Sequence, residues 1–104
     1  MSTCLHDSVR LVAVDAGTIV GMAEVGKYDG EPVLWKLYVA PGRRSAGIGP
    51  TLLNGVVAGL PVGTVRLLTE HIVENERAAD FYQREGFAVL EDGSDIVWRA
   101  RPVA

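Results

Sequence analysis

The chain has 104 residues, a length that holds one compact domain and is too short for two. Hydrophobic residues make up 48% of the sequence and charged residues 22%, which excludes an intrinsically disordered chain. Thirteen acidic against ten basic residues give a net charge of -3, so the chain lacks the overall basic field typical of nucleic-acid-binding and lipid-binding proteins.

Cysteine and histidine are scarce in this sequence. The single cysteine, Cys4, cannot build a disulfide framework, and His6 and His71 do not have the spacing of a zinc site. We therefore expect no metal and a cytoplasmic setting. Residues 1–8 lack the apolar stretch of a signal peptide, so we expect a short tail followed by one domain over residues 9–104. Prolines and glycines interrupt the uncharged segment 45–65, which disfavours a membrane span.

Three β-branched segments dominate the first half of the chain. They predict strands over residues 9–14, 19–25 and 33–39. Turn-forming residues separate them at 15–18 and 28–32. Short turns of this kind connect antiparallel neighbours, so we expect an antiparallel meander.

The hydrophobic period changes in the second half. Apolar residues at helical spacing predict a helix over 50–60, with Pro50 in its first turn and Pro61 at its end. A short strand is expected over 64–69. A second helix should start at the N-cap Asn75 and end before Gly86. Two further strands, 88–91 and 96–101, then form a hairpin. The predicted order is βββαβαββ, an α/β domain.

A glycine-rich loop joins the third strand to the first helix. Such a loop leaves several backbone N–H groups unpaired near the positive end of the helix dipole, which is a geometry that binds phosphate. Arg43 and Arg44 add local positive charge, and Gly47 and Gly49 leave room for an anion. The loop lacks the Lys-Ser or Lys-Thr pair of a Walker motif. A plain strand-to-helix connection is the alternative interpretation.

Two segments resemble the GNAT-type acyl-CoA N-acyltransferases, the acetyltransferase family. Residues 44–49, RSAGIG, resemble the family's Arg/Gln-x-x-Gly-x-Gly/Ala signature and follow a Leu-Tyr-Val strand. Residues 75–87, NERAADFYQREGF, resemble its Asn-x-x-Ala-x-x-Phe-Tyr-x-x-x-Gly-Phe segment. The resemblance runs from about residue 9 to the end. It implies a GNAT-like fold with a mixed, largely antiparallel sheet, and acetyl-CoA as cosubstrate.

The resemblance also implies roles for individual residues. The third strand would offer backbone groups to the pantetheine arm of CoA, and the loop after it would hold the pyrophosphate. The residues implied on the cofactor side are Leu37, Tyr38, Val39, Arg44, Ser45, Ala46, Gly47, Ile48, Gly49, Asn75 and Tyr82. Tyr82 would also protonate the leaving thiolate. Asn75 is equally explained as a helix N-cap, and Tyr82 as a core residue beside Phe81.

The general base is not fixed by the resemblance. An amine must lose a proton to react, and the titratable candidates near the expected cleft are Glu24, Glu70 and His71. His71 has the most suitable ordinary pKa, near 6.5, although a histidine at a strand end is more often structural. We expect Tyr82, His71 and Glu24 to be the catalytic residues.

Members of the family usually begin with a strand and two helices that wall the acceptor pocket. Only residues 1–8 precede the first matched strand here, so we expect this part to be lacking. The acceptor side would then be open, completed by another subunit, or lost together with activity. We expect an N-acetyltransferase acting on a primary amine by direct attack, and a homodimer. The alternative is a catalytically silent acyl-CoA-binding module or partner subunit.

Overall fold

The computed structural model describes residues 9–44 and 46–103. Its strands are β1 (Val9–Asp15), β2 (Thr18–Tyr28), β3 (Glu31–Val39), β4 (Arg66–Ile72), β5 (Ala88–Asp92) and β6 (Ile96–Pro102). The helices are α1 (Ile48–Ala58), α2 (Glu76–Arg84) and the short 3-10 helix η2 (Pro41–Arg43). The predicted order βββαβαββ is confirmed, with η2 as an addition inside the glycine-rich loop.

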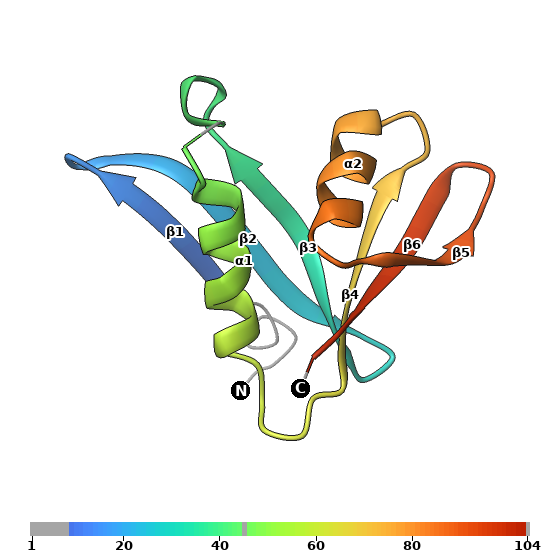
Figure 1. Cartoon of the computed structure of the whole chain (residues 1–104). Coiled ribbons are helices and arrows are strands. Elements are labelled where there is room, and N and C mark those ends of the chain that lie inside the picture. The colour runs from blue at the N-terminus through green and yellow to red at the C-terminus, as the bar shows by residue number, and fades with distance from the viewer. Residues whose placement is uncertain (1–8, 45, 104) are drawn as a thin grey trace.

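All the strands form one six-stranded sheet with the order β1-β2-β3-β4-β6-β5 (Figure 1). Strands β1, β2 and β3 form the predicted antiparallel meander, and β6 pairs antiparallel with both β4 and β5. Only β3 and β4 run parallel, because the chain crosses over through α1 between them. The sheet is therefore mixed and largely antiparallel, as predicted.

The two hairpins of the meander close more tightly than the sequence suggested. Ala16 and Gly17 have φ of 51° and 83°, and Asp29 and Gly30 have φ of 53° and 80°. Two consecutive residues with positive φ make turns that match the right-handed twist of antiparallel strands. The predicted five-residue break at 28–32 is therefore wrong, since β2 continues to Tyr28 and β3 begins at Glu31.

Helix α1 begins and ends two residues earlier than predicted. Gly47 precedes it in a left-handed conformation with φ of 77°, and Pro50 lies in the first turn as expected. At the other end, the Gly59 N–H still bonds to Gly55 and Val56 and the Leu60 N–H to Val57, whereas Pro61 has no N–H to add a further bond. Pro61 thus ends the helix as predicted, although its last α-helical residue is Ala58.

The ends of α2 follow the prediction. The Asn75 side chain accepts a hydrogen bond from the Ala78 N–H at 3.1 Å, which caps the first turn. Gly86 takes the left-handed conformation after the last turn, with φ of 94°. The ring of Phe87 then folds back onto Tyr82, with 5.3 Å between ring centroids. This contact fixes the helix against the start of β5.

Both helices contribute to a single hydrophobic core on one face of the sheet (Figure 1). Its buried members are Ala23, Leu34, Leu52, Leu53, Val56, Leu67, Tyr82 and Phe87. We call this side the helix face. No described helix covers the opposite face. Within the described residues, no helix is long and apolar enough to span a membrane.

Candidate functional site

The sheet opens where β3 meets β4. Only Val33 with Leu68, and Leu34 with Thr69, are paired between these strands, although each strand continues for several residues. In the register between β2 and β3, Trp35 is the extra residue of a β-bulge, and bulges bend the strand that carries them. The two strands therefore diverge beyond this point (Figure 1). We call this feature the β3–β4 split.

A cavity of about 730 Å³ lies along the split. Residues from β3, the following loop, the start of α1 and α2 line it together. Eight of the residues predicted on the cofactor side are among them, namely Leu37, Tyr38, Val39, Arg44, Gly47, Gly49, Asn75 and Tyr82. Ala46 and Ile48 do not line the cavity, and Ser45 lies outside the described residues. The two sequence segments that carried the resemblance thus meet at one site.

The backbone of β3 turns hydrogen-bonding groups toward the split. The Ala40 N–H donates to the Val20 carbonyl at 2.8 Å, so at this position the backbone faces β2. Backbone groups of alternate residues in a strand point to opposite edges. Leu37 and Val39 therefore direct their N–H and C=O groups toward β4, which is no longer paired there. These groups can form strand-like hydrogen bonds to an extended amide chain.

The N-terminus of α1 supplies further donors. Helix geometry leaves the first N–H groups without intrahelical partners, and here Pro50 has none while Thr51 donates to the Gly47 carbonyl. Ile48 and Gly49 lie in this first turn, where backbone N–H groups can bind an anion. Gly47 adopts φ of 77°, a conformation that residues with a side chain rarely take.

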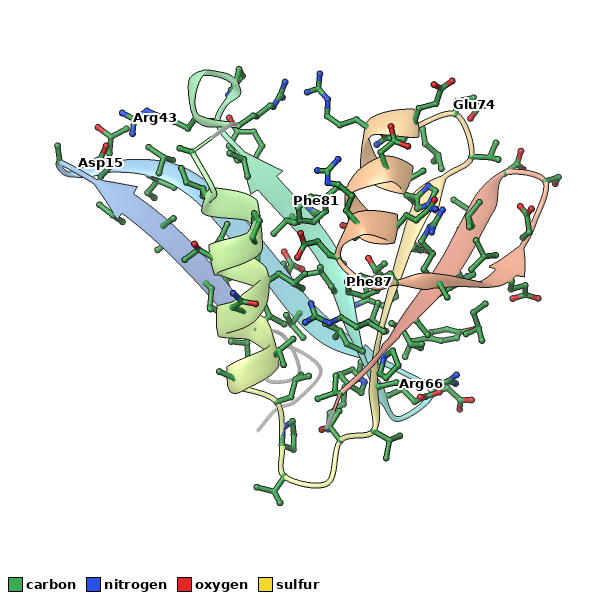
Figure 2. All side chains as sticks on the ribbon, viewed as in Figure 1. Asp15, Arg43, Arg66, Glu74, Phe81 and Phe87 are labelled. Carbon is green, nitrogen blue, oxygen red and sulfur yellow. The ribbon has the colours of Figure 1, made fainter. Side chains whose placement is uncertain are left out.

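Gly49 has a packing role in addition to the one expected. A Cβ at this position would lie 3.1 Å from an atom of the Phe81 ring. A side chain here would therefore crowd the contact between α1 and α2, and Gly49 also lines the cavity, as expected for a residue that leaves room for a ligand. Figure 2 shows Phe81 on the side of α2 that faces α1. The two helices approach each other at this point beside the cavity.

The two adjacent arginines of the loop separate in the structure. Arg43 forms an ion pair with Asp15 at the turn between β1 and β2, away from the cavity (Figure 2). Arg44 lines the cavity instead. Arg77 and Arg84 from α2 also line it, and the sequence analysis missed both. Their seven-residue spacing on one helix was the available signal, because it places them on the same face.

Tyr82 is buried at the apex of the split. Only 7% of its surface is exposed, and burial raises the pKa of its phenol, an effect that hydrogen bonding with Thr69 partly offsets. Thr69 is the last β4 residue paired to β3, and its hydroxyl donates to the Leu34 carbonyl at 2.8 Å. The phenol is therefore protonated at neutral pH, which is the state that a proton donor requires.

Both ring nitrogens of His71 are engaged. Nε2 accepts a hydrogen bond from Arg99 Nε at 3.0 Å, and Nδ1 lies 2.9 Å from the Ile72 carbonyl oxygen. Because a carbonyl can only accept, Nδ1 carries the proton and the imidazole is neutral. The ring stacks near Tyr82 with 6.2 Å between centroids and does not line the cavity. A role as general base would require one of these hydrogen bonds to break.

Glu24 lies elsewhere on the sheet. Its neighbour Ala23 belongs to the core of the helix face, so strand alternation turns Glu24 to the opposite face. There it pairs with Arg10 at 3.4 Å and stands opposite Lys36 in the register. The structure does not bring Glu24 together with Tyr82. Among the described residues, no group of three or more His, Cys, Asp or Glu side chains could hold a metal ion.

Comparisons with known proteins agree with this geometry. A sequence profile of the acetyltransferase (GNAT) domain matches residues 6–89. Among solved structures, a GNAT-family protein from Desulfovibrio desulfuricans is 25% identical, with a TM-score of 0.85 over 94% of this chain. An acetyltransferase from Thermus thermophilus is 25% identical, with a TM-score of 0.84 over 92% of this chain.

The PaiA N-acetyltransferase of Thermoplasma acidophilum, solved in complex with coenzyme A, is 26% identical, with a TM-score of 0.82 over 92% of this chain. The matches cover 71%, 64% and 61% of the Desulfovibrio, Thermus and Thermoplasma chains. This chain therefore corresponds to part of a longer fold in these relatives. Among curated proteins, no sequence matches it significantly.

Proposed function

Because this chain belongs to the GNAT acetyltransferase family, we propose that it binds acetyl-CoA in the β3–β4 split and transfers the acetyl group to a primary amine. The observation that carries the proposal is the cavity itself. It brings the unpaired backbone of Leu37 and Val39, the N-terminus of α1 and the Tyr82 side chain to one continuous surface.

Each part of the cavity suits one part of acetyl-CoA. Leu37 and Val39 would bond the amides of the pantetheine arm as an additional strand bonds a sheet edge. The N–H groups of Ile48 and Gly49, with Arg44 beside them, would hold the pyrophosphate. The amide of Asn75 would meet the pantetheine from α2, in addition to capping that helix. The thioester would then lie at the apex, near Tyr82.

The reaction is a direct transfer. The lone pair of the amine nitrogen attacks the thioester carbonyl carbon, a C–N bond forms, and the C–S bond breaks with its electron pair leaving on sulfur. Tyr82 donates its phenolic proton to that thiolate, and the acceptor nitrogen loses one proton as the amide forms. The proton from nitrogen would pass to water, because both His71 nitrogens are engaged and Glu24 is paired with Arg10, and the Tyr82 phenolate would regain a proton from solvent.

The same observations favour one alternative, a catalytically silent acyl-CoA-binding module. Neither His71 nor Glu24 is placed as a free base beside Tyr82. A module of this kind would bind acetyl-CoA and leave the thioester intact. Activity therefore has to be measured separately from binding.

The first experiment measures binding. CoA should raise the melting temperature, because a ligand that binds only the folded state stabilises it. Arg44→Ala should reduce this shift, since Arg44 lines the cavity. The matched control is Arg43→Ala, which removes the adjacent arginine but only breaks the surface pair with Asp15. Equal shifts in both variants, or no shift in the wild type, would contradict the proposed site.

The second experiment measures turnover as release of the CoA thiol from acetyl-CoA with a panel of primary amines. Release that depends on the amine supports the acetyltransferase. A clear thermal shift with no release from any amine supports the silent module instead.

A further inference from the structure

Three aromatic rings gather on the sheet face opposite the helices. Tyr28 from β2 stacks on Trp98 from β6 with 5.4 Å between ring centroids. Trp35 from β3 meets the same ring edge-on at 6.0 Å. Tyr28 is 57% exposed, and both tryptophans are half-buried. We call this group the aromatic cluster.

Strand register places the aromatic cluster at the apex of the split. Trp35 directly follows Leu34, the last β3 residue paired to β4. Trp98 stands opposite Glu70, the residue after Thr69. Thr69 and His71 lie beside Tyr82 on the helix face, so alternation turns Glu70 and Trp98 to the other face. The cluster therefore starts where the cavity ends, on the far side of the sheet from Tyr82.

Carboxylates flank Trp98 on both sides. Glu70 on β4 and Glu91 on β5 each stand opposite Trp98 in the register, and residues paired in this way share a face. Within the described residues, neither glutamate takes part in an ion pair. The other two carboxylates near this face are neutralised, Glu24 by Arg10 and Glu31 by Arg66.

Packing explains part of this arrangement. Val33 and Leu68 are paired on the same face and are buried, although no described helix lies over them, so the rings supply the cover. Packing does not require two unpaired carboxylates beside the central ring. Exposed ring faces and carboxylates both attract positive charge.

We propose that the aromatic cluster, with Glu70 and Glu91, binds an organic cation. We propose further that the acceptor carries such a cationic group in addition to the amine that reacts. This inference rests on the proposed function for its place in the reaction. The reacting amine would enter the split at Trp35. The second group of the acceptor, which stays positively charged during the reaction, would lie against Trp98. A diamine fits this description, whereas an amine with a neutral or acidic tail does not.

Binding can be tested without turnover. The chain has two tryptophans, and both belong to the cluster, so intrinsic fluorescence reports on it directly. The probes are choline, a quaternary ammonium that cannot be acetylated on nitrogen, and 3,3-dimethyl-1-butanol, its neutral isostere. Choline should change the fluorescence in a saturable way, and the isostere should not.

Variants separate this charge effect from packing. Glu70→Gln should weaken choline binding roughly tenfold, as expected for loss of a carboxylate beside a cation on a ring. Glu74→Gln, the same change in an exposed residue next to the start of α2, should leave it unchanged (Figure 2). Equal binding of choline and its isostere, no saturable response to choline, or equal loss in both variants would overturn the inference.

Turnover supplies a second test, with 1,3-diaminopropane, propylamine and β-alanine as acceptors. The diamine should have the highest kcat/KM, and Glu70→Gln should lower that value for the diamine more than for propylamine. If CoA binds and all three amines react equally, the inference fails and the proposed function stands. If choline binds but CoA does not, the cation site stands and the proposed function fails.

Discussion

Within each half of the sheet the strands are paired over most of their length, whereas few residue pairs join the two halves. In the first half, β2 pairs with both neighbours over most of its length and α1 packs on the meander. In the second half, β6 pairs with β4 along all seven of its residues. Between the halves, β3 and β4 share only two residue pairs.

Besides the shared core and the aromatic cluster, contacts between the halves lie at the two ends of the split. At the paired end, Arg66 of β4 binds Glu31 of β3 through two hydrogen bonds of 2.7 and 2.8 Å. At the helix end, Gly49 contacts Phe81. The fold therefore concentrates strand pairing inside each half and leaves backbone groups of β3 unpaired at the junction, where a ligand can bind them.

The largest expected effect comes from the apex of the split. Tyr82→Phe keeps the aromatic ring that packs against Phe81 and Phe87 but removes the hydroxyl. We expect kcat to fall about 100-fold, since general acid catalysis contributes at least that much. The KM for acetyl-CoA should change little. Steady-state kinetics measures both constants, and an unchanged kcat would leave Tyr82 with a packing role only.

The pH profile sharpens this prediction. Burial raises the pKa of Tyr82 above its ordinary value of 10.0, so the folded protein keeps the phenolic proton where an unfolded chain would lose it. Wild-type kcat should therefore show no decline from phenol ionisation below pH 10. The same shift contributes stability that is present below pH 10 and is lost as the pH rises through the folded-state pKa. A kcat that declines with an apparent pKa well below 10, and does so only when Tyr82 is present, would contradict this assignment.

The second effect concerns the contact between the two helices. Gly49→Val should destabilise the fold by about 1–3 kcal/mol, the usual cost of overpacking, because the side chain would meet the Phe81 ring. Phe81→Leu in the same chain should restore part of the loss. Gly42→Val is the matched control, since a Cβ there meets nothing within 4 Å. Urea denaturation gives the free energy of unfolding of each variant. Equal losses of this free energy in Gly42→Val and Gly49→Val would refute the contact.

The third effect concerns the outer edge of the first half. Strand β1 is an edge of the sheet, and Val9, Val12 and Val14 on it are each more than half exposed. We propose that a second copy covers this edge, because unpaired apolar edge strands favour association. Val12→Lys should weaken the dimer roughly tenfold or more, as charge in an apolar interface does.

Sedimentation velocity at micromolar concentration measures the association. Val62→Lys, at a fully exposed valine outside β1, is the control and should sediment like the wild type. A wild-type chain that sediments as a folded monomer would end the proposal.

The smallest effect lies at the paired end of the split. Hydrogen bonding to Arg66 lowers the pKa of Glu31 below 4.5, so the folded state favours the carboxylate. The resulting stability is present above pH 4.5 and is lost as the pH falls through the lowered pKa. Glu31→Gln should therefore lower the melting temperature slightly at pH 7 and have no effect at pH 2. The change in melting temperature is small because the ion pair between Glu31 and Arg66 is partly exposed to solvent. If the difference in melting temperature between the wild type and Glu31→Gln persists at pH 2, the ionised carboxylate of Glu31 is not its cause.

Local patterns were sufficient to predict which elements form and in what order, although β4 runs over Arg66–Ile72 and not over the predicted residues 64–69. β-Branched runs marked β1, β2 and β3, and the spacing from Leu52 onward marked α1. The Asn75 cap and Gly86 also gave the ends of α2 correctly. These features depend on neighbours within a few residues, so the sequence contains them directly.

The junction could not be predicted in the same way. Its extent depends on the pairing of Val33 and Leu34 with residues about 35 positions later, and on a bulge at Trp35 that no local pattern marks. The contact between Gly49 and Phe81 likewise depends on how two helices meet. Arg77 and Arg84 reach the cavity only because of that arrangement. The sequence therefore indicated the cofactor motifs, and tertiary packing determined what surrounds them.

Amide hydrogen exchange by NMR, with and without CoA, measures whether Leu37 and Val39 keep free backbone groups in the β3–β4 split and whether CoA binds to them. We expect their amides to exchange faster than that of Ala40, which bonds to Val20, and CoA to slow their exchange markedly. CoA binding that leaves the exchange of both amides unchanged would contradict this expectation.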